Sequence, residues 1–137
     1  MILYRPMGIE ELRLVYESGM TSFPPRKPDQ PIFYPVLNLE YAREISRRWN
    51  VDSPSAAGYV AKFFLDDDYG KRYPVQKVGT AHHLELWIPS EQLAEFNQKI
   101  FPPILIVDAF FGDAFQGCIP NRFGLRGKNA AEQLGIL

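Results

Sequence analysis

A short strand that leads directly into a helix constrains this fold most. Residues 83–89 alternate apolar and polar side chains and stop at Pro89, and the next eight residues repeat apolar side chains at helical spacing. The aliphatic side chains of such a strand share one face, so Glu85 and Trp87 share the other. Either this second face is wet, or Glu85 is held in a cleft for a purpose. The pattern alone leaves both interpretations open.

Other strand and helix patterns follow along the chain without regular alternation. The expected strands are residues 2–5 (ended by Pro6), 32–36, 58–65, 84–88 and 104–111. The expected helices are residues 8–18 (closed by Gly19), a segment capped by Asn38, a segment capped by Ser90 that buries Leu93, Phe96 and Ile100, and residues 128–134. This mixture predicts an α+β fold rather than a doubly wound sheet. The nearly continuous apolar run of residues 104–111 predicts a strand in the middle of the sheet.

Length and composition indicate one globular domain, residues 1–137, with a core of its own. The formal net charge of −1 gives no sign of a nucleic-acid or anionic-membrane binder. Cys118 is the only cysteine, which excludes an internal disulfide framework and a cysteine-based zinc site. The N-terminus lacks the apolar core of a signal peptide, and no stretch is long enough for a transmembrane helix, so we expect a cytoplasmic protein.

Several familiar motifs are absent or incomplete. No glycine-rich fingerprint follows a strand, the Gly127-Lys128 pair lacks the rest of a P-loop, and no serine has the context of a nucleophile elbow. The acidic triplet 66–68 lacks the other ligands of an EF-hand loop. His82 and His83 are candidate metal ligands, but consecutive residues of a strand face opposite ways. We therefore expect no metal site.

One constellation has a chemical interpretation. Arg5 on the first strand offers a fork of donors suited to phosphate, and Phe23, Phe33 and Tyr34 offer flat faces for an aromatic ring. Glu85 could accept a hydrogen bond from a ribose hydroxyl and stabilise positive charge that develops on the sugar. Loss of nicotinamide from NAD passes through such an oxocarbenium-like state.

The order of these motifs resembles the ADP-ribosyltransferase-like fold. The motifs are Tyr4-Arg5, Gly19, Phe23-Pro24, Phe33-Tyr34 and the run from Glu85 to Pro89. The segment 3–38 is similar to a family of small uncharacterised bacterial proteins labelled ADP-ribosylation/crystallin-like. The resemblance implies a mostly antiparallel split sheet with flanking helices. It also implies an NAD site that Tyr4, Arg5, Phe23, Phe33 and Tyr34 line, with Glu85 as the catalytic carboxylate.

The chain departs from the arginine-modifying members of this superfamily at two points. The serine-threonine-serine triplet of their second strand is absent, and His83 stands where many of them have glutamine or glutamate. These departures argue against transfer to arginine, and His83 serves either another acceptor or none.

Three functions stay open. The first is ADP-ribosyl transfer or NAD hydrolysis, with NAD as substrate, no metal, and a protein as candidate acceptor. The second is a non-catalytic binding module on the same fold that uses the proline-rich loop 21–31 and exposed aromatic side chains to contact a partner, a second copy of the chain included. The third is hydrolysis or group transfer on an RNA phosphate, which needs more basic residues in the pocket than we can assign.

Overall fold

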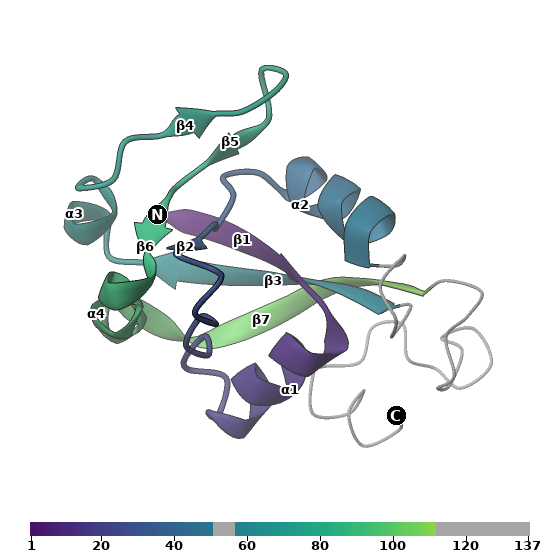
Figure 1. Cartoon of the computed structure of the whole chain (residues 1–137), viewed down its shortest axis with the longest axis horizontal. Coiled ribbons are helices and arrows are strands. Elements are labelled where there is room, and N and C mark those ends of the chain that lie inside the picture. Colours follow the sequence, from purple (N-terminus) through teal and green to yellow (C-terminus); the bar gives the residue numbers. More distant parts are fainter. Residues whose placement is uncertain (51–56, 112–137) are drawn as a thin grey trace.

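The computed structural model describes residues 1–50 and 57–111 and confirms the mixed α+β class (Figure 1). The strands are β1 (Ile2–Met7), β2 (Ile32–Phe33), β3 (Ala57–Leu65), β4 (Gln76–Lys77), β5 (Leu84–Glu85), β6 (Ile88–Pro89) and β7 (Ile100–Phe111). The helices are α1 (Ile9–Glu17), α2 (Leu39–Ile45) with the π-helical turn Ser46–Asn50, α3 (Asp67–Gly70), and α4 (Leu93–Gln98) after the 3₁₀ turn Ser90–Gln92. Among these helices none has the length and apolar character needed to cross a membrane. The expected helix at 128–134 lies outside the described residues.

Antiparallel pairing joins the strands across the molecule. β3 lies between β1 and β7. Val36 pairs with Tyr4 of β1 on one side and with Glu85 of β5 on the other. β2 and β6 pair in the same register as Val36 and Glu85, and β4 pairs with β5. Through the bridges of Val36, the described segments follow one another as β4, β5–β6, residues 32–36 (which include β2), β1, β3 and β7.

The prediction that residues 104–111 form a central strand was wrong. β3 is central and β7 pairs only with β3 among the described strands. Ile104 of β7 is buried, whereas Leu105 and Val107 are exposed. A continuous apolar run arises here because the strand leaves apolar side chains on the surface, not because both of its faces are covered.

Two strands run through prolines at which the sequence pattern places a strand boundary. β1 continues through Pro6 to Met7. The N–H of Tyr4 points to Val36, away from β3, and Pro6 two residues later faces the same way, so its missing N–H costs no bond to β3. β7 begins at Ile100 and includes Pro102 and Pro103, which an edge strand tolerates where its register with β3 shifts. Ile100 thus starts a strand instead of ending a helix.

The capping predictions differ in outcome. The Asn38 side chain accepts the N–H of Tyr41 at 2.8 Å and begins α2, as expected. Gly19 has φ +80° directly after the C-cap of α1, also as expected. Ser90 does not cap α4: it lies in the preceding 3₁₀ turn, where its N–H donates to Pro31.

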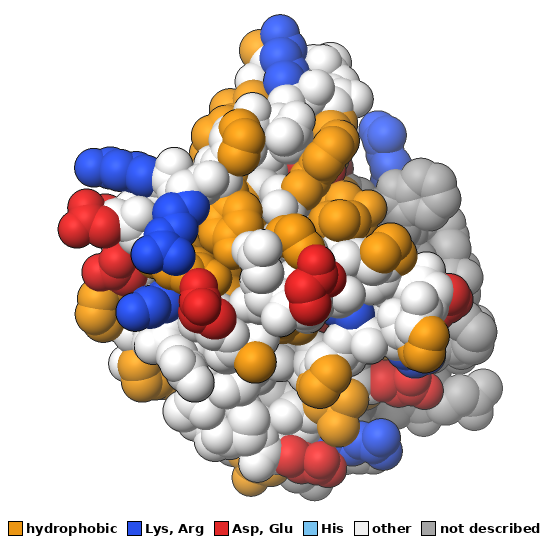
Figure 2. Space-filling view, turned by 60° about the vertical axis from the view of Figure 1, so that its left-hand side comes forward, with side chains coloured by type: hydrophobic (Ala, Val, Ile, Leu, Met, Phe, Trp, Pro, Cys, Tyr) orange, Lys and Arg blue, Asp and Glu red, His pale blue; other side chains and the backbone are white. Residues whose placement is uncertain are grey.

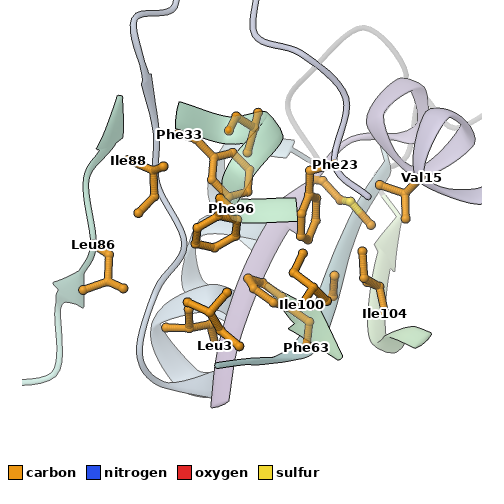
Figure 3. Packing of buried hydrophobic residues seen from close by; sticks show 14 of the residues in the cluster. Leu3, Val15, Phe23, Phe33, Phe63, Leu86, Ile88, Phe96, Ile100 and Ile104 are labelled. Carbon is orange, nitrogen blue, oxygen red and sulfur yellow. The ribbon is translucent and has the colours of Figure 1, made fainter. Parts of the chain in front are cut away.

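The main core lies between the sheet and α1 and α4. Its centre is a cluster of phenylalanine rings with centroids 5.0–6.0 Å apart (Figure 3). The rings are those of Phe23, Phe33, Phe63 and Phe96. A smaller cluster around Val36, Ala42 and Val60 packs α2 against the opposite face of the sheet. Each fully buried ring contributes about 1.5–3 kcal/mol to folding, so this cluster fixes the loop and strand that carry Phe23 and Phe33.

Candidate functional site

Glu85 is held at the α2 side of the sheet, with only 8% of its surface exposed. Trp87 donates its indole Nε1–H to Glu85 Oε1 at 2.7 Å, and Tyr41 donates its hydroxyl to Oε2 at 3.0 Å. Glu85 and Trp87 therefore share a face, as the alternation predicts, and Glu85 on that face is buried rather than exposed to solvent. Each carboxylate oxygen retains a second acceptor position.

Backbone pairing explains why these groups meet. Leu86 donates its N–H to Pro35 at 2.9 Å and Leu37 donates to Leu84 at 3.0 Å, which fixes Glu85 opposite Val36. The chain then passes directly into α2. Its Asn38 cap places Tyr41 in the first turn, above the strand that carries Glu85.

Both histidines face one carboxylate on α2. His82 Nε2 and His83 Nε2 each lie 2.8 Å from an oxygen of Glu44, and the two imidazole centroids are 4.4 Å apart. The expectation that consecutive residues face opposite ways does not hold, because His82 lies in a turn before β5. That turn is closed by a 3.0 Å bond from the N–H of His83 to Thr80.

Tyr41 links this histidine cluster to Glu85. Its ring stacks on His83 with centroids 4.5 Å apart and 22° between the planes, while its hydroxyl donates to Glu85. Burial, and then the hydrogen bond to Glu85, raise the pKa of Tyr41 to about 12, so its hydroxyl stays protonated and remains a donor. Hydrogen bonds from the two histidines lower the pKa of Glu44 and keep it ionised.

Trp87 also lines a groove to which no other residue of this cluster contributes. The groove has a volume of about 480 Å³, within the range of ligand sites, and its other lining residues include Arg72 and Tyr73. The side chain of Trp87 is 42% exposed. Figure 2 shows exposed hydrophobic side chains below the projecting β4–β5 hairpin. Among the described residues that line this groove, Trp87 is the one that also hydrogen-bonds to Glu85.

Arg5 lies on the opposite face of the sheet from Glu85. Directly paired residues of neighbouring strands project to the same face, so Tyr4, Val36 and Glu85 share one face and Arg5 projects to the other. There its guanidinium makes two 2.9 Å bonds to Glu11.

The other expected cofactor contacts also divide between the two faces. Arg5 lies 4.8 Å over the ring of Phe33, which belongs to the main core with Phe23. Tyr4 packs against the α2-side cluster. The ring of Tyr34 is exposed, and the strand register sets this residue opposite Trp87. The structure therefore brings together Glu85, His83 and Tyr4, and separates them from Arg5, Phe23 and Phe33.

Two residues of the site, Tyr41 and Glu44, are missing from the sequence prediction. They lie three positions apart on α2, a spacing that sets both on one side of a helix. The Asn38 cap was the available signal, because it fixes where α2 begins and hence which side chains of its first turns face β5.

Comparison with known proteins yields no relative of this chain. It matches no protein-family model, no curated protein and no solved structure.

Proposed function

We propose that this chain is an NAD-binding protein of ADP-ribosyltransferase-like fold, whose Glu85 stabilises the ribosyl cation that forms when nicotinamide leaves. The strand order supports the proposal. The resemblance assigns an arginine, an aromatic residue and a glutamate to three strands, and here β1, the segment 32–36 and β5 are direct neighbours through Val36. A cytoplasmic setting would supply the NAD.

The observation that carries the proposal is the fixed carboxylate of Glu85. Two donors hold its oxygens in place at 2.7 and 3.0 Å, so it needs no reorientation when positive charge develops on a bound ribose. The bond from ribose C1′ to the nicotinamide nitrogen breaks, and its electron pair leaves with nicotinamide. Water or an acceptor hydroxyl then attacks C1′ and gives up its proton.

His83 is the proposed acceptor of that proton, at Nδ1, which would give up its long 3.3 Å hydrogen bond from the Thr80 N–H. Its Nε2 lies 2.8 Å from Glu44, which orients the ring and would stabilise the imidazolium. The ring of Tyr41, already stacked on His83, and the exposed indole of Trp87 supply flat surfaces for the nucleotide bases. On this account Arg5 supports the fold and does not bind NAD.

The ion pair of Arg5 favours a second candidate, a non-catalytic binding module. In that case the exposed rings of Tyr34 and Trp87, opposite each other in register, together with the loop 21–31 contact a protein partner. This candidate predicts no turnover of NAD.

Nicotinamide release from NAD separates the two candidates. We expect slow release by the full chain, and a loss of about 10²–10³-fold in the Glu85→Gln variant, because the amide carries no charge to stabilise the cation. Glu91→Gln, at an exposed position just after the same strands, is the matched control and should keep wild-type turnover. Circular dichroism verifies that both variants fold. Absence of NAD binding and turnover at high protein concentration would select the binding module.

A further inference from the structure

Glu44, His82 and His83 form a cluster whose ligand atoms all lie within 4.8 Å of one another. We propose that these three side chains bind one divalent transition-metal ion, with Zn²⁺ as the ion to test. The site shares His83 and Glu44 with the proposed NAD chemistry, in which both act without a metal, but its test does not depend on NAD turnover.

The donor set suits such an ion. Two imidazole nitrogens and one carboxylate are ligands that Zn²⁺ takes in proteins, and three protein ligands leave one coordination position for water or a substrate atom. Ligands of a tetrahedral zinc ion lie about 3.3 Å apart when each is about 2.0–2.1 Å from the metal. Each histidine nitrogen is 2.8 Å from its own oxygen of Glu44, about half an ångström less than this spacing, so the imidazoles and the carboxylate must shift to admit the ion.

The ring of His83 is held in place from two sides. Tyr41 stacks on one face, and Gly79 lies so close to the ring that a Cβ at this position would be 2.3 Å from Nδ1. Only glycine leaves the space that this ring occupies. A side chain prearranged in this way loses less rotamer freedom when it binds a metal.

Thr80 contacts the outer nitrogens of both imidazoles. Its hydroxyl lies 3.2 Å from His82 Nδ1 and can accept a hydrogen bond from the Nδ1–H of a ring that binds metal through Nε2, the usual outer contact of a metal-bound histidine. Its N–H donates to His83 Nδ1 at 3.3 Å, so His83 carries its proton on Nε2 in this arrangement. Metal binding at Nε2 moves that proton to Nδ1 and breaks the long Thr80 bond. Zn²⁺ binding therefore changes the tautomer of His83.

The cluster is accessible to an ion from solvent. The side chains of Glu44, His82 and His83 are 31%, 45% and 24% exposed. Ion exchange therefore needs no opening of the core.

Calorimetric titration of the chelator-treated full chain with Zn²⁺ tests the proposal. We expect one equivalent to bind, and affinity to fall at least about tenfold in each of Glu44→Gln, His82→Ala and His83→Ala. Glu40→Gln, one turn earlier on α2 and outside the cluster, should bind as wild type. Cys118→Ser should also bind as wild type, which excludes the only thiol as the ligand.

A second measurement reports the site without any variant in it. The chain has two histidines, so long-range ¹H–¹⁵N spectra should show His83 change from the Nε2–H to the Nδ1–H tautomer as Zn²⁺ is added.

A further variant tests the packing around the site: Gly79→Ala should weaken binding by displacing the ring of His83. No binding, binding that survives both histidine substitutions, binding lost only in Cys118→Ser, or an unchanged His83 tautomer would overturn the proposal.

Discussion

At the scale of single residues, Arg5 and Glu85 show how one position in a register decides the role of a charged group. Both lie in strands, and Tyr4, the neighbour of Arg5, pairs through Val36 with the face of Glu85. Arg5 therefore projects to the opposite face of the sheet. There the carboxylate of Glu11 on α1 accepts hydrogen bonds from the Nε–H and from one Nη2–H of its guanidinium. This pair is mostly enclosed, with side chains 11% and 18% exposed.

Glu11→Gln tests the structural role of this pair. The change leaves a mostly buried guanidinium without its charged partner, so the free energy of unfolding should fall by about 1–3 kcal/mol. Urea denaturation followed by circular dichroism measures the loss. Glu10→Gln, an exposed change one residue earlier in the same helix, should cost less than about 0.5 kcal/mol. Equal effects of the two changes would show that the Arg5–Glu11 pair adds nothing to stability.

Period-two alternation was enough to predict that Glu85 and Trp87 share a face. It does not identify their partners, because a hydrogen bond such as that from Tyr41 depends on where α2 packs, 44 residues away in sequence. The same reason explains why the sequence pattern groups Arg5 with Glu85. Residue types were recognisable, whereas the direction of each side chain depended on the register of strands far apart in the chain.

At the scale of elements, the proline-rich loop 21–31 is anchored by a helix far along the chain. Asn97 of α4 accepts the N–H of Phe23 and donates to its carbonyl, both at 2.9 Å, so its amide pairs with that backbone as a neighbouring strand would. Phe23 itself is buried against Phe33 and Phe63. The loop therefore leaves the core at a fixed point before it reaches β2.

Asn97→Ala should destabilise the fold, because it leaves the N–H and carbonyl of Phe23 without partners in a partly buried position. We expect a loss of about 1–3 kcal/mol in the free energy of unfolding, measured by urea denaturation. Gln98→Ala is the control, since this neighbouring side chain on α4 is exposed. A stability of Asn97→Ala equal to that of the control would contradict the anchoring role.

Sequence patterns located most elements but not their ends. Asn38 and Gly19 marked a helix start and a helix end because capping is local chemistry. Pro6 and Pro102 marked false boundaries, since whether a strand tolerates proline depends on which edge lacks a partner. Which edge of a strand is paired depends on the arrangement of all the strands in the sheet.

At the scale of the whole molecule, the sheet divides the chain into two sides with different roles. The main core and the Arg5–Glu11 pair lie on the side of α1. The polar cluster of Tyr41, Glu44, His82, His83, Glu85 and Trp87 lies on the side of α2. Figure 1 shows where the two helices lie. Our central claim is that the nucleotide binds on the α2 side, next to Glu85. Neither composition nor local patterns indicate this division, because it follows from the strand order.

The indole N–H of Trp87 reports most directly on that claim, since it donates to Glu85 and lines the adjoining groove. In ¹H–¹⁵N spectra of the full chain, with Trp87→Phe used to distinguish its signal from that of Trp49, we predict a saturable shift of the Trp87 indole signal as NAD is added. The Nε–H signal of Arg5 should stay in place. An unmoved Trp87 signal, or a shift confined to Arg5, would contradict the account.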